Sequence, residues 1–410
     1  EWRQKAVGDW WVEFRKKAAD NRKDFCIMGY VCNAGLWSEF DYKFGYDLFA
    51  MARSNDFVGT EIWLGNPMDN YRFVYADRRY FNIFRHEGGY PVFGLVYHSN
   101  DEYFAYFGWA MNNMLGQSTW DSTEVSVKSN TPNFLKWPEN MNKQFAREMG
   151  DVAIIFSEKS RNWAPSGVPA RDGIGLSQIL SDNHVQHVIL TERSLKESED
   201  LKKFRVVILP STCCLSDEEI QVVREYVKQG GHVYVMGDAG LLDVYGTARA
   251  EWGFADIVGC DVSVNATWPV GTRLSSEGGQ SIPYSQSLLK IIPRSNSTSL
   301  KVLVNTMNNQ GRILGPACVS NTFGKGTITY CSAQLGTMNY QTVYRDTWEY
   351  ELDPSLAEIF LKTFRETAGS EPLNFEVIQI SPQMISSHWR QNIDGVDCTL
   401  IHFLNATGVR

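Results

Sequence analysis

The sequence predicts an α/β protein: a (β/α)₈ TIM-barrel portion, then a second α/β domain, then a short antiparallel β segment. Three observations lead to this fold class. Short apolar runs alternate with helical stretches up to about residue 135, a pattern typical of a parallel sheet covered on both faces. A loop rich in Ser, Asn, Thr and Pro at 122–140 ends the first series, and a second series follows it. From Asn374 onward the expected strands become antiparallel, and Asp394-Gly395 is a hairpin signal.

The first series contains four β-units. After an opening helix, strands are expected at 25–33, 56–63, 91–97 and 117–120, and helices at 46–53, 71–86 and 101–115. A complete barrel needs roughly 250 residues, so four units in roughly 120 residues make half of one. We therefore expect these strands to lie side by side and parallel. The chain opens inside a helix and closes one strand into a sheet, so we expect it to be part of a longer polypeptide.

The second series has clear helix boundaries. Ser216-Asp-Glu-Glu219 is a capping box, and Gly230-Gly231 ends the helix that it opens. Asp353-Pro354 supplies a cap and a first-turn proline for a last helix. Further elements are expected as a helix at 174–181 and strands at 152–156, 185–190, 204–209, 232–236, 302–305 and 326–331.

Composition limits the partners of this protein. A net charge of −8 over 410 residues argues against binding to nucleic acid or to an anionic membrane, because both select for Lys and Arg. No apolar run approaches the roughly 20 residues of a membrane span. The sequence has no C-x-x-C pair and no G-x-G-x-x-G after a strand, so we expect neither a metal site nor a dinucleotide or other cofactor. Sequons at Asn265, Asn296 and Asn405 arise by chance as well as in secreted proteins, so the location stays open, with a secreted or extracytoplasmic protein as one alternative.

Tryptophan is concentrated in the first third of the chain, which holds eight of the thirteen. The flat C–H faces of sugar rings stack on aromatic faces, so this bias suits a saccharide site. The alternative for any single tryptophan is packing between barrel and helices.

Two stretches resemble a known family. Asn33, Phe40-Asp-Tyr42 and Asp56-Phe-Val-Gly-Thr-Glu-Ile-Trp63 look like strands five and six of glycoside hydrolase family 42 β-galactosidases. The stretch from Asp151 to Val262 is similar to the trimerisation domain of that family, and His402-Phe-Leu-Asn405 to the start of its C-terminal β domain. The resemblance to the trimerisation domain rests on several short segments. They include Val152-Ala-Ile-Ile-Phe156, Val206-Val-Ile-Leu-Pro-Ser211, Tyr226-Val-Lys-Gln-Gly-Gly231 and Phe323-Gly-Lys-Gly-Thr-Ile328.

The resemblance implies three domains. These are the C-terminal half of a glycosidase barrel (1–135), a flavodoxin-like trimerisation-type domain related to class I glutamine amidotransferases (148–370), and the start of a β-sandwich (371–410). It also implies a saccharide substrate, a homotrimer, and a retaining mechanism that uses two glutamates. The acid/base would precede Glu1. At the position expected for the nucleophile the sequence reads Val96-Tyr97-His98 without a carboxylate, so a divergent or inactive barrel that binds carbohydrate or serves as a structural module is the alternative.

Five residues at expected strand ends are candidates for the site. Glu61 is a carboxylate in an apolar strand, which needs a partner or a role; it is the catalytic candidate, and a hydroxyl ligand or a salt bridge is the alternative. Asn33 and His98 would hold substrate hydroxyls, although Asn33 could cap the backbone and His98 could be an ordinary loop residue. Trp63 and Trp120 would form a sugar platform.

A rival interpretation is an amidotransferase-like hydrolase. That chemistry needs a Cys on a tight turn directly after a strand, paired with a His. The turn after the expected strand 232–236 is Gly237-Asp-Ala-Gly240 and has no Cys, while Cys213-Cys214 has no His near it in sequence. The sequence therefore disfavours this chemistry.

Overall fold

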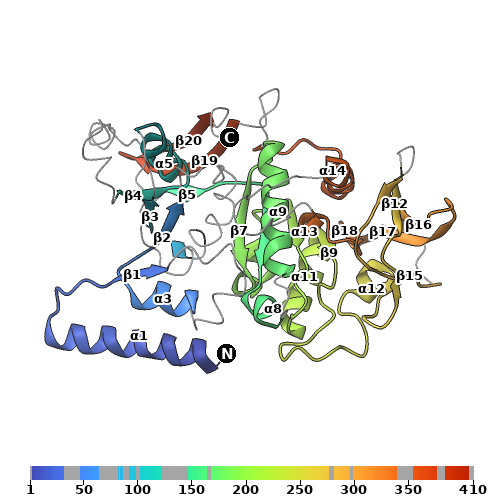
Figure 1. Ribbon diagram of the computed structural model, residues 1–410, viewed down its shortest axis with the longest axis horizontal. Coiled ribbons are helices and arrows are strands. Elements are labelled where there is room, and N and C mark those ends of the chain that lie inside the picture. The colour runs from blue at the N-terminus through green and yellow to red at the C-terminus, as the bar shows by residue number, and fades with distance from the viewer. Residues whose placement is uncertain are drawn as a thin grey trace.

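The computed structural model shows a four-stranded sheet at one end of the molecule, a nine-stranded sheet that extends from its middle to the other end, and a C-terminal hairpin beside α5 (Figure 1). No helix in the described part of the chain has the length and apolar character that a membrane crossing requires. The structure describes residues 2–31, 47–63, 82, 84–85, 92–97, 102–121, 146–163, 168–276, 281–295, 299–338, 354–375 and 384–405.

The four-stranded sheet is parallel throughout, in the order β1-β2-β3-β4. The expectation of four adjacent parallel strands is therefore confirmed. Of the expected helices, 71–86 lies mostly outside the described residues. The elements of this segment are the strands β1 (Met28–Val31), β2 (Phe57–Trp63), β3 (Val92–Tyr97) and β4 (Gln117–Asp121) and the helices α1 (Trp2–Asn21), α3 (Leu48–Ser54) and α5 (Glu102–Met114).

The two faces of this sheet differ in burial. One face carries the fully buried Val58, Thr60 and Val96, and α5 lies against it, where the Asn112 side chain donates a 3.0 Å hydrogen bond to the Gly94 carbonyl. The other face, called the open face below, is exposed only in part: Met28, its register partner Phe57 and Trp120 are 49%, 44% and 42% exposed, whereas Phe93 and Leu95 between them are buried. An aromatic and apolar surface is therefore available on one side of the four strands.

The nine-stranded sheet has a parallel half and an antiparallel half. Its order is β13-β12-β16-β17-β18-β9-β8-β6-β7, and the five strands from β18 to β7 are parallel. The strands are β6 (Val152–Phe156), β7 (His187–Thr191), β8 (Val206–Leu209), β9 (His232–Met236), β12 (Arg273–Ser276), β13 (Ile282–Pro283), β16 (Lys301–Met307), β17 (Ile313–Phe323) and β18 (Gly326–Cys331).

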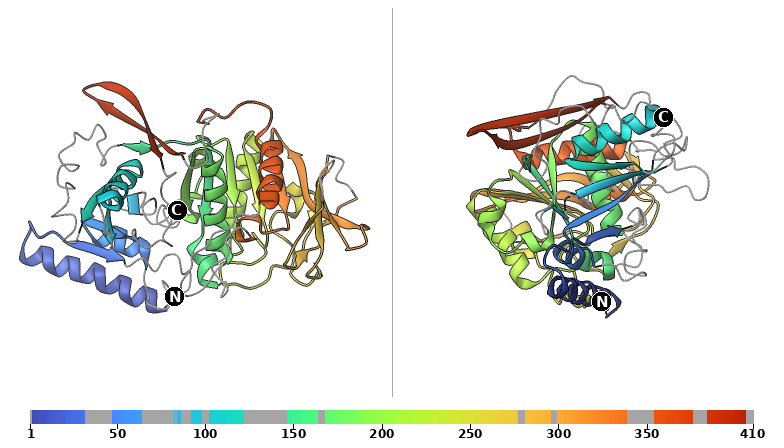
Figure 2. Two further views of the ribbon diagram at one scale, coloured as in Figure 1. Left: turned by 45° about the horizontal axis from the view of Figure 1, so that its top comes forward. Right: turned by 90° about the vertical axis from the view of Figure 1, so that its left-hand side faces the viewer.

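Helices cover both faces of the parallel half (Figure 2), and a separate apolar cluster fills each side. The helix α11 packs Ile220, Val223 and Val227 into one cluster, and its expected capping box and left-handed Gly230 are both present. The helices are α8 (Glu158–Trp163), α9 (Val168–Asp182), η2 (Glu192–Ser194), α10 (Ser198–Leu201), α11 (Asp217–Gln229), α12 (Ala255–Val258), α13 (Leu335–Met338) and α14 (Pro354–Ala368). Short antiparallel pairs are β10 (Cys260–Asp261) with β15 (Ile292–Pro293) and β11 (Thr267–Trp268) with β14 (Leu288–Leu289).

The antiparallel half was largely missed by the sequence pattern. The strand β17 contains Gly315-Pro316, a pair of residues that predicts the end of a strand. In the structure its pairing with β16 is irregular, with register shifts around Val304 and Thr306, and such irregularities accommodate residues that a regular ladder does not.

The C-terminal hairpin joins the first segment to the second. Its strands β19 (Met384–Ile393) and β20 (Val396–Asn405) meet at Asp394-Gly395, where both residues have positive φ (52° and 86°) as the expected two-residue turn requires. The two-residue strand β5 (Arg147–Glu148) pairs with β19. Most of the expected strand 375–380 lies outside the described residues.

Candidate functional site

The open face of the four-stranded sheet carries the candidate site. Trp120 is fully described and stands one residue before the end of β4. Glu61 and Trp63 belong to β2, but their side chains, together with Asn33 and His98, lie outside the described residues. The structure therefore locates Glu61 by its backbone register.

That register places Glu61 and Trp120 in the same row, meaning the set of residues that pair with one another across neighbouring strands. Glu61 is the partner of Leu95 in β3, and Leu95 is the partner of Trp120 in β4. Paired positions of neighbouring strands share a face of a sheet, so the Glu61 position belongs to the face that carries Trp120. Asp121, the carboxylate that ends β4, pairs with Val96 in the next row, which belongs to the opposite face.

Three aromatic rings cluster on this face. Phe93 lies 6.3 Å from Tyr30 with nearly parallel planes and 5.4 Å from Trp120, measured between ring centroids. Trp120 keeps 42% of its surface exposed. A Cβ at Gly59, between Tyr30 and Phe93 in the row, would approach the Phe93 ring to 2.5 Å. The glycine therefore leaves room for the ring to lie across β2.

The sequence pattern selected Trp120 and missed Tyr30 and Phe93. In the sequence both are ordinary members of apolar strands. The available signal was Gly59, since a glycine inside a strand often marks a close approach by another group.

The end of β3 agrees with the sequence reading. This strand runs to Tyr97 and carries no carboxylate. The next helix, α5, begins at Glu102, so Glu102 stands in its first turn, where an acidic residue is favoured by the helix dipole.

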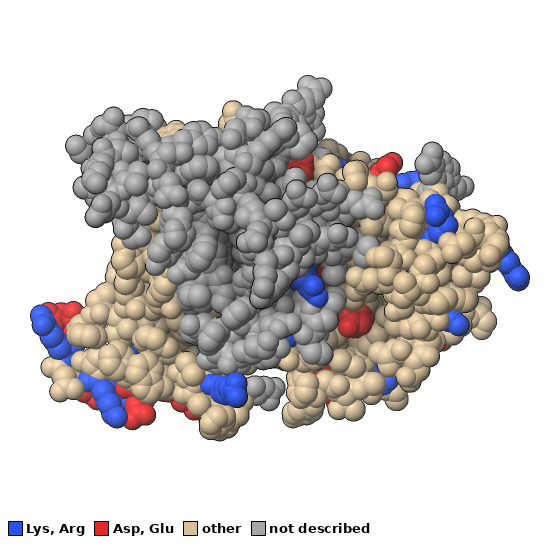
Figure 3. Space-filling model, viewed as in Figure 1, with Lys and Arg blue, Asp and Glu red and all other residues tan. Residues whose placement is uncertain are grey.

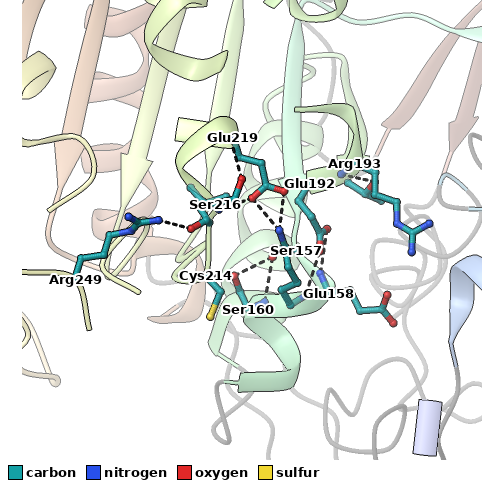
Figure 4. A network of polar contacts seen from close by, with 12 residues as sticks. Ser157, Glu158, Ser160, Glu192, Arg193, Cys214, Ser216, Glu219 and Arg249 are labelled. Atoms are coloured by element: carbon teal, nitrogen blue, oxygen red, sulfur yellow. Dashed lines mark hydrogen bonds and ion pairs between the residues drawn. The ribbon is translucent and has the colours of Figure 1, made fainter. Parts of the chain in front are cut away.

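A second polar cluster lies where the first segment meets the nine-stranded sheet (Figure 4). The Glu192 carboxylate, after β7, accepts hydrogen bonds from the backbone N–H groups of Glu158 and Lys159 at 3.2 and 3.1 Å. It thereby satisfies two donors at the start of α8, which no carbonyl within that helix can do. The Lys159 ammonium in turn contacts the Glu219 carboxylate at 2.6 Å.

Glu158 connects this cluster to α1. Its carboxyl accepts hydrogen bonds from the fully buried Arg161 guanidinium at 3.0 Å and from the Gln4 amide of α1 at 3.3 Å. Burial and, to a smaller extent, the nearby charges of Asp47 and Glu192 raise the pKa of Glu158 to about 8, despite the lowering effect of Arg161. Glu158 is therefore mostly protonated at neutral pH.

The contact between α1 and α8 at Glu158 should become less stable as the pH rises. Because the pKa of Glu158 is higher in the folded state than in an unfolded chain, the folded state binds more protons between about pH 4.5 and 8. This group should lower the free energy of unfolding by up to about 1.4 kcal/mol per pH unit within that window. Thermal unfolding between pH 5 and 9 should show a steeper decline for the natural protein than for Glu158→Gln, which can still accept both hydrogen bonds. Equal slopes would contradict this role, and Glu199→Gln at an exposed site is the matched control.

The buried thiols are not arranged for nucleophilic catalysis. Cys213 and Cys214 lie after β8 with their sulfur atoms 3.7 Å apart. The adjacent thiol and burial raise the pKa of Cys213, which disfavours the thiolate that such chemistry needs. An amidotransferase-like hydrolase would carry its Cys on the tight turn directly after β9. Here that residue is Gly237, which has φ of 57° and no side chain. These positions do not support the amidotransferase interpretation.

No metal-binding group is present in the described ranges, where no set of three or more His, Cys, Asp or Glu side chains could hold a metal ion.

Comparison with known proteins gives one family match. Residues 150–351 match the model of the β-galactosidase trimerisation domain. No curated protein sequence matches the chain.

Several solved structures share the fold of this chain. Gan42B, a family 42 β-galactosidase from G. stearothermophilus, superposes with a TM-score of 0.67 at 11% identity over 98% of this chain and 66% of its own. The β-galactosidase of Halorubrum lacusprofundi gives 0.66 at 12% identity over 98% and 67%. The exo-β-1,4-mannosidase Op5Man5 from Opitutaceae bacterium strain TAV5 gives 0.57 at 12% identity over 81% and 65%. The chain thus spans slightly less than two thirds of Gan42B.

Proposed function

We propose that this chain, whose residues 150–351 match the model of the β-galactosidase trimerisation domain and whose fold is similar to that of family 42 β-galactosidases, is part of a glycoside hydrolase acting on β-galactosides or related saccharides. The observation that carries the proposal is the open aromatic face of the four parallel strands, with the Glu61 position in the same row as Trp120. A sugar would stack on the exposed Trp120 ring while polar groups at the strand ends bind its hydroxyls.

In this proposal Glu61 is one of the two carboxylates of a retaining mechanism. As nucleophile it would attack the anomeric carbon and form a glycosyl-enzyme intermediate, which water then hydrolyses. The second carboxylate, about 5–5.5 Å away, would protonate the leaving oxygen and then activate the water. Asn33, Trp63 and His98 would bind the substrate beside Trp120.

The domain assignment is part of the same proposal. Residues 1–135 would be the C-terminal half of the barrel, whose interior is the open face carrying Trp120. Residues 148–370 would be the flavodoxin-like trimerisation-type domain. The parallel order β7-β6-β8-β9-β18 supports this, because numbered along the chain it is the flavodoxin order 2-1-3-4-5. Residues 371–410 would begin the β-sandwich, and the assembly would be a homotrimer.

The activity is tested by incubating the protein with nitrophenyl glycosides of β-galactose, β-mannose and α-fucose. We expect release of nitrophenol from the β-galactoside or a close relative, and the β-anomer of the free sugar as the first product in the proton NMR spectrum. An α-anomer released first would contradict retention. Binding of saccharides without hydrolysis of any glycoside would favour a non-catalytic carbohydrate-binding protein instead.

A further inference from the structure

The Trp120 ring packs against the rings of Phe93 and Tyr30. Its centroid lies 5.4 Å from that of Phe93 and 6.5 Å from that of Tyr30, and the planes meet at 61° and 69°. Phe93 and Tyr30 are stacked on each other, with 10° between their planes. We refer to these two stacked rings as the aromatic bed. Because both contacts with the indole are steep, neither ring of the bed lies flat on Trp120.

The three rings differ in what a ligand could reach. Trp120 is 42% exposed, whereas Phe93 and the neighbouring Leu95, the register partner of Trp120, are only 8% and 4% exposed. A sugar on this face therefore has the Trp120 ring to stack on and almost none of the Phe93 ring. Phe93 can influence such a sugar only through Trp120.

Gly59 makes the aromatic bed possible. It pairs with Tyr30 on one side and with Phe93 on the other, so it lies between the two rings in their row. A Cβ at this position would meet both the ring and the backbone carbonyl of Phe93. Any side chain at position 59 would separate the two rings. The bed thus depends on a glycine in the strand between them, which is a usual reason for a glycine inside a strand.

We propose that Phe93 is a positioning residue of the saccharide site, which together with Tyr30 fixes the tilt of the Trp120 ring on which a sugar stacks. This inference rests on the proposed function, because it takes the ligand of Trp120 to be a saccharide. Stacking requires the aromatic plane to match the plane of the sugar ring, so an indole that turns freely is in the right orientation for only part of the time. An indole that is already held loses less conformational entropy when the sugar binds.

Steady-state kinetics test the role of Phe93. Phe93→Leu keeps an apolar side chain in the buried position but removes the ring. It should raise KM for the best nitrophenyl glycoside by about threefold to tenfold, the factor that corresponds to the usual energy of one aromatic pair. The kcat value should stay within about twofold, because Phe93 does not touch the reacting atoms. Tyr30→Phe keeps the ring and is the matched control, with both constants unchanged. In a Trp120→Ala background, Phe93→Leu should raise KM no further.

The orientation of the indole is followed separately by fluorine NMR of protein labelled with 5-fluorotryptophan. The Trp120 resonance is the one that disappears in Trp120→Phe. It should shift or broaden in Phe93→Leu and keep its position in Tyr30→Phe. It should also move when methyl glycosides of the three sugars of the activity assay are added to the natural protein. Circular dichroism establishes that each variant is folded. If Phe93→Leu does not fold, Tyr30→Leu removes the other ring of the bed at a partly exposed position and should give the same changes.

Four results would overturn the inference. The first is a folded Phe93→Leu variant that keeps the natural KM, and the second is a raised KM with an unmoved Trp120 resonance. The third is an equal effect of Phe93→Leu with and without Trp120, since Phe93 would then act by another route. The fourth is a Trp120 resonance that no saccharide moves. A natural protein that hydrolyses no glycoside would remove the hydrolase proposal alone, and the dissociation constant from the NMR titration would then replace KM.

Discussion

Replacement of Glu61 by Gln should lower kcat/KM for the best glycoside substrate by about 10³ or more. The nucleophile of a retaining glycosidase supplies several kcal/mol of transition-state stabilisation, and an amide cannot form the glycosyl-enzyme bond. The register supports this choice of residue, because the Glu61 position shares its row with the exposed Trp120, whereas Asp121 falls in the row of the opposite face.

Steady-state kinetics of three variants separate the possible roles. Glu61→Gln should lower kcat, Trp120→Ala should mainly raise KM because it removes a stacking surface, and Glu102→Gln in the first turn of α5 should change either constant less than threefold. A loss of only a few-fold in Glu61→Gln would show that the carboxylate binds a hydroxyl and that another group is the nucleophile. Azide or formate restoring activity to Glu61→Ala would support the nucleophilic role directly.

The parallel parts of the fold could be predicted from the sequence because their signals are local and strong. The continuous apolar runs at Val152–Phe156 and at 232–236 are strands buried on both faces. The boundaries of α11 follow from the capping box at Ser216 and the glycine at 230, which act within a single helical turn. Such features depend little on distant parts of the chain.

The antiparallel strands and the junction between segments could not be predicted in the same way. In the pairing of β17 with β16, Pro316 lies opposite Asn305, directly beside a shift of register at Val304. Glu158 looks like an ordinary first-turn acid, but its pKa is raised by burial and by the charges of Asp47 and Glu192, which are distant in sequence. Long-range neighbours decide both features, and a single sequence does not display them.

The sequence proposes a location for the candidate site but not the aromatic cluster found there. Strand-end polar residues and a biased distribution of tryptophan point to the four-stranded sheet, and Trp120 is 42% exposed on one face of it. The partners of that ring, Tyr30 and Phe93, come from strands that are adjacent only after folding. Their spacing in sequence carries no periodic signal of the cluster.

The helix α1 is a further case in which the sequence does not reveal the important contact. Lysine, arginine and acidic side chains gather along this helix (Figure 3), and pairs such as Lys5–Asp9 and Lys17–Glu13 have the spacing of helical neighbours. A side-chain link from α1 to the nine-stranded sheet domain runs through the neutral Gln4, whose amide N–H donates to Glu158 and whose amide oxygen accepts from Asn162. Exposed ion pairs of this kind contribute little to stability, so the buried amide is the more important contact.

Replacement of Trp389 by Ala should destabilise the protein by about 3–5 kcal/mol, the range for truncating a large buried aromatic side chain. Trp389 belongs to β19 but is fully buried against the first segment, where its indole N–H donates to the Met114 carbonyl at 2.9 Å. The Arg85 guanidinium lies 4.8 Å from the ring centroid, and Gly116 approaches so closely that a Cβ there would come within 2.7 Å of the ring. One side chain therefore joins the C-terminal hairpin to the helix α5 and the turn that follows it.

Denaturant unfolding of three variants tests this role. Trp389→Phe keeps most of the buried ring and loses the N–H donor, so it should cost about 1–3 kcal/mol, less than the Ala variant. Ile401→Ala, on the exposed side of the same hairpin, should change stability by less than about 0.5 kcal/mol. If unfolding occurs in steps, the loss in Trp389→Ala should fall on the step that also releases the β19–β20 hairpin, followed by hydrogen exchange of residues 384–405. A Trp389→Ala variant as stable as Ile401→Ala would mean that the hairpin docks through its backbone pairing with β5 and not through this ring.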